Sequence, residues 1–329
     1  MLSLEPIVDA EGVSTWQAVN AAAFSADYVG LTADPAEERL PALRGPVSGE
    51  RAEFWLGSAD GVPVAAGELT LPLYDNLGAA YGEIQIHPEH RRKGYGRALL
   101  GKLRQRTREE NRTVLYLSSA DAGAAFARAA GAQPVLTEVR RMLDVTFMAP
   151  AALAELTAGA AQAATGYTML TWQDRAPEEL HAGLAELMAR MSTDTPMEDM
   201  ALDPEDWDVP RYRERQEATL ASGRRTLGCA VRHESTGALA GFTEITVNRR
   251  RTNVAYQWDT IVLEAHRGHR LGLWLKAANL TQLRALSPQT RLVNTWNAAS
   301  NPHMIAINEA LGFRAAEAWT NWQLDLAPR

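Results

Sequence analysis

The chain of 329 residues contains one cysteine and no long apolar run. A single cysteine, Cys229, excludes an internal disulfide and a cluster of thiolate metal ligands. Residues 228–231 read as a buried strand, in which cysteine acts as a small hydrophobic residue rather than a nucleophile. No apolar stretch approaches the roughly 18 residues that span a bilayer, and residues 1–6 show no secretory signal. These absences predict a cytoplasmic protein with no membrane partner.

The chain also lacks an excess of positive charge. Its net charge of −7 argues against a general nucleic-acid or anionic-membrane surface, which requires a basic face. Local basic clusters are therefore expected to bind local anions. With 46% apolar and 22% charged residues, the composition is that of a globular protein, and the length suits two domains of about 150 residues each.

Metal-ligand and nucleotide patterns are missing as well. His266, His269 and His303 are not accompanied by a cysteine, and the His-Glu-x-x-His pattern of zinc enzymes is absent. The glycine pattern of dinucleotide-binding proteins and the lysine pattern of P-loops are absent too. We therefore expect no metal site, and a phosphate site of another kind.

Residues 83–96 combine an apolar-alternating strand, a basic turn with two glycines and the start of a helix near Arg97. Gly94 and Gly96 let the backbone approach a ligand closely, and glycine tolerates a positive φ. Free N–H groups and the dipole at the head of the helix favour an anion there. Three basic residues of the turn add positive charge, namely Arg91, Arg92 and Lys93. The sequence predicts a phosphate-binding turn, and an ordinary solvated turn is the alternative.

This turn resembles the acetyl-CoA signature of the GNAT acetyltransferase superfamily. In that signature Arg or Gln is followed by two residues, Gly, one residue, and Gly or Ala. Arg91, Gly94 and Gly96 match it. The resemblance implies an acetyl-CoA pyrophosphate across the turn, with the pantetheine arm along the strand that contains Ile84 and Ile86.

The first half reads as helices, antiparallel strands, and then strand, turn, helix, strand and helix. Residues 14–24 have the spacing of an amphipathic helix, and residues 52–71 read as a hairpin around an Asp-Gly turn. A further strand is predicted at 113–117, followed by an alanine-rich helix that ends at Gly131. This order predicts an α/β fold with a mixed, mostly antiparallel sheet flanked by helices. It is also the order of the GNAT fold.

The second half repeats the first, and residues 266–272 take the place of the basic turn. A constant offset in residue number relates three pairs of positions, namely Arg91 and Arg267, Gly96 and Gly272, and Glu83 and Asp259. We therefore expect two copies of the fold, at residues 1–150 and 167–329. An alanine-rich linker is expected at 151–166.

The second copy departs from the pattern at Arg270, where the family usually has its first glycine. If the backbone takes a positive φ there, a non-glycine residue costs about 1 kcal/mol. If it stays helical, Arg270 adds a charge near the phosphates. The sequence leaves both alternatives open, so cofactor binding is better supported at the first turn.

Acetyl transfer to an amine requires a neutral amine, a stabilised oxyanion and a departing thiolate. An alkylamine has a pKa of about 10, so a general base is useful at neutral pH. Glu83 and Asp259, each eight residues before the arginine of its turn, are the candidate catalytic bases, since the family commonly places an acid on this strand. A solvated or ion-paired carboxylate is the alternative reading of both residues. His87 is a second candidate base.

The sequence identifies the oxyanion donors and the general acid less directly than the base. The expected donors to the oxyanion are backbone N–H groups near Ile86 and His87 and near Val262 and Leu263, if the strand splays as the resemblance implies. Many family members carry a tyrosine four residues before the glycine that ends the last helix, and Ala127 and Asn308 stand there instead. A thiol with a pKa of about 8.5 leaves without a dedicated acid.

The resemblance assigns acetyl-CoA binding to residues of both turns. In the first copy they are Ile86, His87, Arg91, Arg92, Lys93, Gly94, Tyr95, Gly96 and Arg97. In the second copy they are Val262, Arg267, Gly268, His269, Arg270, Leu271, Gly272 and Asn297. For Asn297, a capping or turn role is equally natural. The acidic run 198–208 is either a solvated loop or an attractor of a cationic amine at the second copy.

These features predict an acetyl-CoA-dependent N-acetyltransferase that acts on a primary amine of a small molecule. One alternative is a non-catalytic acetyl-CoA-binding sensor or scaffold. Another is a division of labour, with one catalytic and one structural copy. Fold resemblance does not name the substrate, and the oligomeric state is not predicted.

Overall fold

The computed structural model describes residues 2–327 and divides them into two compact units. Unit 1 comprises residues 2–138, 197–203 and 318–327, and unit 2 comprises residues 139–196 and 204–317. Domain boundaries at residues 150 and 167 remain a prediction. No helix within residues 2–327 is long and apolar enough to cross a bilayer.

Unit 1 contains a six-stranded sheet in the order β1-β2-β3-β4-β5-β12. All neighbouring pairs are antiparallel except β4 and β5, which are parallel. Its elements are β1 (Leu2–Pro6), α1 (Ala10–Asp27), η1 (Ala36–Glu38), α2 (Leu40–Arg44), β2 (Glu50–Ala59), β3 (Val62–Pro72), β4 (Ala79–Ile86), η2 (Pro88–His90), α3 (Tyr95–Glu109), β5 (Val114–Ala120), α4 (Asp121–Ala129) and most of β12 (Arg314–Asp325). The first residues of β6 (Gln133–Asp144) also belong to this unit.

Local sequence signals explain these elements. The Asp60-Gly61 turn joins β2 to β3 with φ values of 51° and 81°, which short hairpin turns require. Helix α1 begins where the Asp9 carboxylate accepts a hydrogen bond from the Gly12 N–H at 2.8 Å. Helices cover both faces of the sheet, because alternate residues of β3 pack on different helices. Ala66 packs with Trp16 of α1, whereas Leu69 lies in the cluster that includes Leu99 of α3.

Unit 2 repeats this arrangement, with the strand order β7-β8-β9-β10-β11-β6. The pair β10 and β11 is parallel, like β4 and β5. Its elements are α5 (Pro150–Ala163), β7 (Tyr167–Gln173), η3 (Glu178–Leu180), α6 (His181–Asp194), α7 (Val209–Ala221), β8 (Arg224–His233), β9 (Leu239–Asn248), β10 (Val254–Val262), η4 (Glu264–His266), α8 (Leu271–Leu286), β11 (Leu292–Ala298), α9 (Pro302–Ala310) and the second part of β6. The predicted fold class, two copies of a mixed, mostly antiparallel sheet flanked by helices, is confirmed.

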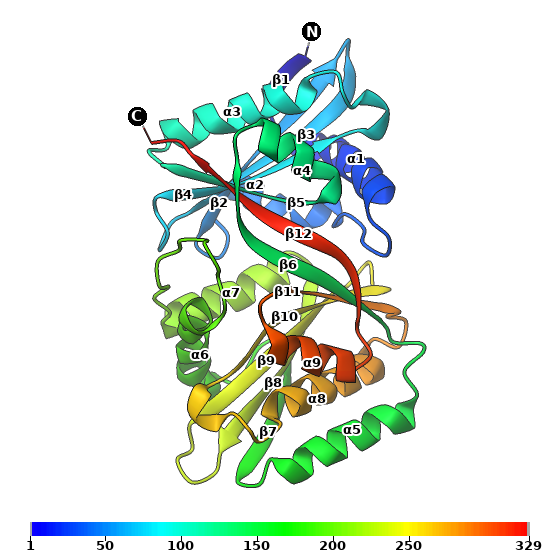
Figure 1. Cartoon of the computed structure of the whole chain (residues 1–329), viewed down its shortest axis with the longest axis vertical. Coiled ribbons are helices and arrows are strands. Elements are labelled where there is room, and N and C mark those ends of the chain that lie inside the picture. The colour runs from blue at the N-terminus through cyan, green and yellow to red at the C-terminus, as the bar shows by residue number, and fades with distance from the viewer. Residues whose placement is uncertain (1, 328–329) are drawn as a thin grey trace. The chain divides into compact units, whose positions relative to one another are not determined.

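The sixth strand of each sheet comes from the other half of the sequence. In unit 1 the C-terminal residues Trp319–Asp325 of β12 pair antiparallel with β5 (Figure 1). Trp322 is 1% exposed there, and its indole N–H donates to the Ser119 hydroxyl at 3.0 Å. In unit 2 the corresponding place beside β11 belongs to β6. The predicted linker at 151–166 is largely helix α5, whose Leu153 is buried in a core cluster of unit 2.

Candidate functional site

The central parallel strands of each unit separate toward their carboxyl ends. In unit 1 the pairing of β4 with β5 runs from Ala79 to Gly82 and then stops, although β4 continues to Ile86. In unit 2 the pairing of β10 with β11 covers Val254 to Tyr256, although β10 continues to Val262. Each sheet therefore has an opening at the end of its central strand, as the resemblance implied.

Backbone donors of β4 line the opening of unit 1. The His87 N–H donates to the Val64 carbonyl at 2.9 Å. Because successive N–H groups of an antiparallel strand point to opposite edges, those of Ile84 and Ile86 point toward the opening. The expected oxyanion donors are thus corrected, since the His87 N–H is occupied and the Ile86 N–H has the suitable direction.

The same correction applies to unit 2. The Leu263 N–H donates to the Ala240 carbonyl at 2.9 Å, so the Val262 N–H points to the edge that faces β11. A β-bulge between Gln257 and Thr260 shifts the register of β10 against β9. Bulges re-aim backbone groups and side chains near active sites, and unit 1 shows no register shift between β3 and β4.

The basic turn of unit 1 leads directly into α3. Gly94 adopts a left-handed conformation with a φ of 86°, and Arg92 also has a positive φ of 66°. No side chain caps the N-terminus of α3, so its first N–H groups remain available to an anion. A Cβ at Gly96 would lie 3.4 Å from Phe126 of α4, which is an ordinary van der Waals contact.

The arginine of the turn has a structural role that the signature alone does not reveal. Both terminal nitrogens of Arg91 donate to the Asp27 carboxylate, at 2.7 and 2.8 Å. Its Nε donates to the Ile86 carbonyl at 3.2 Å, which holds the turn against the end of β4. In unit 2 the Nε of Arg267 donates to the Val262 carbonyl at 3.3 Å in the same way. These arginines therefore fix the shape of the turns.

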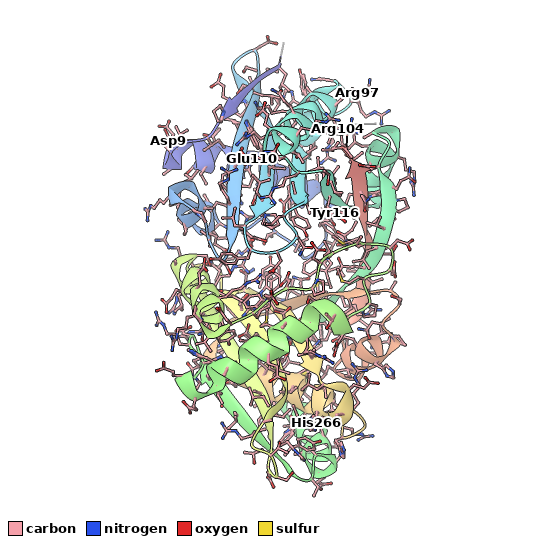
Figure 2. All side chains as sticks on the ribbon, turned by 90° about the vertical axis from the view of Figure 1, so that its left-hand side faces the viewer. Asp9, Arg97, Arg104, Glu110, Tyr116 and His266 are labelled. Atoms are coloured by element: carbon pink, nitrogen blue, oxygen red, sulfur yellow. The ribbon has the colours of Figure 1, made fainter. Side chains whose placement is uncertain are left out.

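Other cations of the first turn are free to meet a phosphate. Arg92, Lys93 and Arg97 are exposed, and none has an ion-pair partner within residues 2–327. Arg97, labelled in Figure 2, lies in the first turn of α3. Tyr95 begins the helix and packs against the core cluster of unit 1. The positive charge available to a phosphate thus belongs to residues that follow Arg91, which is itself paired with Asp27.

The second turn repeats this geometry with a substituted residue. Gly268 has a φ of 87°, and Arg270, which precedes α8, has a φ of 56° in the left-handed region. Of the two alternatives for Arg270, the structure therefore shows the one with positive φ. Leu271 and Gly272 begin the helix and are buried, and a Cβ at Gly272 would lie only 2.9 Å from Ile307 of α9.

We expect an Arg270→Gly variant to raise the free energy of unfolding of unit 2 by about 1 kcal/mol, because it relieves a left-handed non-glycine residue. Gly94→Ala in unit 1 is the matched control. It is expected to lower stability by a similar amount, since a Cβ at Gly94 meets no atom within 4 Å and only the backbone is strained. Urea unfolding measures both, and destabilisation by Arg270→Gly would contradict the explanation.

The histidines of the second turn belong to an aromatic cluster. The Tyr167 hydroxyl lies 2.9 Å from Nδ1 of His266, and the rings of His233 and His269 lie within 5.3 Å of the Tyr167 ring centroid. Burial, with the neighbouring His233 and His269, lowers the pKa of His266. His266, labelled in Figure 2, is therefore a neutral partner of Tyr167 near pH 7, and His269 is exposed.

The two candidate bases lie in different surroundings. Glu83 is exposed on β4, directly opposite Glu68 of β3. Asp259 is partly buried on β10, and its Oδ2 lies 3.0 Å from an Nη of Arg215. Burial raises the pKa of the Asp259 carboxyl, while Arg215 opposes that shift. The ion-paired alternative considered from the sequence thus describes Asp259 and not Glu83.

Glu68 is a buried acid that the sequence motifs did not reveal. Its side chain is 8% exposed, and Oε1 lies 3.7 Å from Nη1 of Arg39. Burial, opposed by Arg39 and assisted by Glu83, raises its pKa to about 7. A carboxylate with a pKa near neutrality suits general base catalysis. The constant offset between the two copies, applied to every charged residue, pairs Glu68 with Glu244 and would have found it.

A buried lysine was also not revealed by the sequence motifs, and the constant offset pairs it with the apolar Leu100. Lys276 of α8 is 1% exposed, and its Nζ donates to Oδ1 of Asn308 at 2.6 Å. Nδ2 of Asn308 in turn donates to Oδ1 of Asn297 at 2.6 Å. Asn308, which replaces the family tyrosine, therefore connects the lysine to β11. Burial lowers the pKa of Lys276 to about 7. Asn297 is tied into this network, and its predicted contact with acetyl-CoA stays a prediction.

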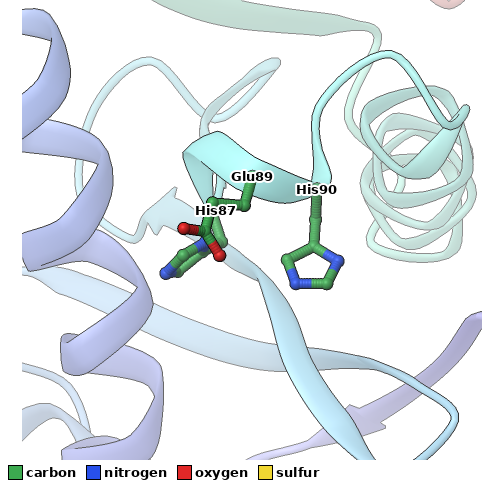
Figure 3. A group of neighbouring side chains, drawn as sticks. All are labelled: His87, Glu89 and His90. Atoms are coloured by element: carbon green, nitrogen blue, oxygen red, sulfur yellow. The ribbon is translucent and has the colours of Figure 1, made fainter.

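One group of possible metal ligands occurs within residues 2–327. His87, Glu89 and His90 each offer a ligand atom, and these atoms lie within 4.8 Å of one another (Figure 3). The three residues lie on and just before η2, ahead of the first basic turn. Nδ1 of His87 is buried and has no hydrogen-bond partner. Acetyl transfer does not require a metal ion. The spacing of this group, His-x-Glu-His, also differs from the His-Glu-x-x-His pattern of zinc enzymes.

The acidic run at 198–208 is split between the units. Residues 197–203 belong to unit 1, where Glu198 accepts a hydrogen bond from the Thr137 N–H at 3.0 Å. The hydroxyl of Tyr116, labelled in Figure 2, donates to the Ala201 carbonyl at 3.0 Å. The expected location beside the sheet of the second copy is therefore wrong for this part of the run. Local patterns contain no sign of that contact, because it joins distant segments.

Known proteins resemble the chain along its whole length. Its structure superposes on a tandem GNAT protein from the clavulanic acid biosynthesis pathway with a TM-score of 0.83 and 29% sequence identity, covering 100% of both chains. A GCN5-related N-acetyltransferase from Sphaerobacter thermophilus shares the fold, with a TM-score of 0.69 and 15% identity over 99% of this chain and 96% of the other.

Sequence comparison gives the same family. Mycothiol acetyltransferase from Thermomonospora curvata is 39% identical over 95 residues, which are 29% of this chain and 31% of that enzyme, so the match spans about a third of its length. The model of the acetyltransferase (GNAT) family matches residues 17–132 and 190–313. With two matched regions, two repeated sheets and two basic turns, the chain belongs to the GNAT acetyltransferase family as a tandem of two family domains.

Proposed function

We propose that this protein transfers an acetyl group from acetyl-CoA to a primary amine of a small molecule. The single observation that carries the proposal is the combination, at the end of β4, of an opened sheet and a basic turn with an uncapped helix N-terminus. The opening leaves backbone donors free, and the turn offers N–H groups and cations to a pyrophosphate. Both features would serve one long ligand with a phosphate end and a reactive acyl end.

Each part of unit 1 would then have a defined task. The first N–H groups of α3, with Arg92, Lys93 and Arg97, would hold the pyrophosphate. The N–H groups of Ile84 and Ile86 would pair with the pantetheine arm and stabilise the oxyanion. A carboxylate on the sheet would take a proton from the incoming ammonium, so that the neutral nitrogen attacks the thioester carbonyl.

We propose a division of labour between the two units as the second candidate. The observation that favours it is the Arg215 side chain, which lies 2.6 Å from Glu244 and 3.0 Å from Asp259. This pairing leaves unit 2 without a free acid at the place where unit 1 exposes Glu83. Unit 2 would then bind a ligand or support the fold without catalysing the transfer.

The proposal is tested by thiol release from acetyl-CoA over a panel of primary amines. We expect amine-dependent release by the wild type. Replacing Arg92, Lys93 and Arg97 together with alanine should raise the KM for acetyl-CoA at least about 10-fold, because each lost charge weakens phosphate binding. Arg270→Ala, which removes one exposed cation of the second turn, is the control and should have a smaller effect.

Two results would contradict the proposal. Unchanged KM for acetyl-CoA in the triple variant would remove the first turn as the phosphate site. Tight binding of acetyl-CoA without thiol release by any amine would favour the sensor or scaffold function.

A further inference from the structure

Both units contain the same three-residue charge cluster. In each, a cation comes from the helical segment over one sheet face, one acid from the second strand of the central hairpin, and one acid from the strand that leads to the basic turn. Each member has its counterpart at the same constant offset, so the clusters are Arg39, Glu68 and Glu83 in unit 1 and Arg215, Glu244 and Asp259 in unit 2. The cluster is therefore part of the duplicated structure and not a chance contact.

The cluster of unit 2 is closed. Nη1 of Arg215 lies 2.6 Å from Oε2 of Glu244, and its Nη2 lies 3.0 Å from Oδ2 of Asp259. The Tyr212 hydroxyl lies 3.5 Å from the other oxygen of Glu244. One arginine thus pairs with both acids, and an incoming ammonium would have to displace it.

The cluster of unit 1 is open. Arg39 approaches only one oxygen of Glu68, at 3.7 Å. Oε2 of Glu68 is buried and has no hydrogen-bond partner among residues 2–327. Glu83, directly opposite, is exposed, and its side chain makes no hydrogen bond in the described part of the chain. A buried carboxylate oxygen without a partner is costly, and an ammonium with three donors would satisfy it together with Glu83.

The open cluster lies on the side of the sheet opposite to the basic turn. Glu68 follows Ala66 on the face covered by α1, whereas a Cβ at the intervening Gly67 would lie 2.7 Å from Leu99 of α3. Glu83 pairs with Glu68 and therefore shares its face. A phosphate at the N-terminus of α3 and an amine at Glu68 would thus approach from opposite faces. The opening between β4 and β5 joins those faces, so the acyl group and the amine would meet there.

We propose that Glu68, with Arg39 and Glu83, forms the acceptor-amine site of unit 1, and that Arg215 fills the equivalent place in unit 2, so that transfer occurs at unit 1. This inference rests on the proposed function. Glu68 takes a proton from the ammonium, and the neutral nitrogen forms a bond to the thioester carbonyl carbon. The carbon–sulfur bond breaks, and the thiolate takes the second proton of the nitrogen. Glu68 returns its proton to solvent, which gives an amide, a free thiol and one proton.

The charges around Glu68 set the pH range of this step. Burial raises its pKa to about 7, with Arg39 and the Thr70 hydroxyl opposing and Glu83 and Glu50 assisting. The carboxylate form accepts the proton, so kcat/KM should increase as the pH rises through about 7. A Glu68→Gln variant has no such titration, and its residual activity should lose that dependence.

The test compares Glu68→Gln with its internal control, Glu244→Gln, using the best amine of the panel. We expect Glu68→Gln to lower kcat/KM at least about 100-fold, as loss of a general base does, with the Kd for acetyl-CoA unchanged by calorimetry. Glu244→Gln should change kcat/KM less than about 3-fold. Glu68→Asp, which keeps a titrating group, should retain more activity than Glu68→Gln and keep the pH dependence.

Several outcomes would overturn the inference. Full activity of folded Glu68→Gln, checked by circular dichroism, removes Glu68 from the reaction while leaving the proposed function intact. A greater loss in Glu244→Gln than in Glu68→Gln places the transfer in unit 2. If Glu68→Gln fails to fold, undiminished kcat/KM in a folded Glu68→Ala variant, which has no carboxylate at this position, overturns the inference in the same way. Absence of thiol release by the wild type removes both the inference and the proposed function.

Discussion

Replacing Trp322 with alanine is expected to lower the free energy of unfolding of unit 1 by about 3–5 kcal/mol, the usual cost of truncating a buried tryptophan. The indole is 1% exposed in the main core cluster of unit 1, and the variant loses its hydrogen bond to Ser119. Arg128 also lies over the ring, 5.1 Å from its centroid. A change close to the end of the chain thus destabilises the unit that contains its beginning.

Hydrogen exchange locates this effect. Amides of β4 and β5 should exchange faster in Trp322→Ala, whereas amides of β8 and β9 in unit 2 should keep their protection. Trp258→Ala is the matched control, because Trp258 is 47% exposed and its loss should cost much less. Faster exchange confined to unit 2 would show that β12 does not complete the first sheet.

Replacing Lys276 with methionine is expected to flatten the dependence of stability on pH. The amine is buried with Asn308 and Met304, and burial lowers its pKa to about 7. Between about pH 7 and the unfolded value of about 10.4, the unfolded chain holds a proton that the folded chain lacks. Stability of the wild type therefore rises with pH in this window, by up to about 1.4 kcal/mol per pH unit.

The measurement is urea unfolding of the wild type and Lys276→Met at about pH 7.5 and about pH 9.5. These values lie roughly two pH units apart within that window. The difference in unfolding free energy between wild type and Lys276→Met should grow by about 2 kcal/mol in favour of the wild type. Loss of the Asn308 contact shifts both values equally and does not affect the slope. Lys102→Met on α3, where the lysine is only partly buried, should leave the slope unchanged. Parallel curves for wild type and Lys276→Met would refute a neutral buried amine.

Local patterns explain why the fold and the turns were predictable. The hairpin around Asp60-Gly61 and the turn at Gly94 are each set by residues within a few positions of one another. Asp60, Gly61 and Gly94 have the positive φ values that such turns require. Repetition then predicted the second sheet from the first.

The charge cluster was not predictable in the same way. Arg39 and Glu68 lie far apart in sequence, and an ion pair between them depends on how the helical segment crosses the sheet. Glu68 also stands in a strand whose other inward residues are apolar, so periodicity alone assigns its face but not its partner. The comparison of two copies supplies the missing information, because a shared spacing at three positions indicates a shared contact.

The exchange of the sixth strand between the two sheets was also not predictable from local sequence patterns. The pairing of β12 with β5 joins segments about 200 residues apart in the sequence, and local patterns do not show such a contact. The family matches end at residues 132 and 313, immediately before β6 and β12 begin. The repeated unit recognised in sequence is therefore the part that precedes the exchanged strand.

The position of β12 has a consequence for synthesis on the ribosome. Chains usually fold from the N-terminus as they emerge, yet the first sheet needs Trp319–Asp325, which are made only after all of unit 2. Until then β5 presents an unpaired edge, which is open to pairing with other chains. The unit that is translated first is thus the unit that is completed last, and a nascent chain arrested before residue 319 would depend on chaperones to protect that edge.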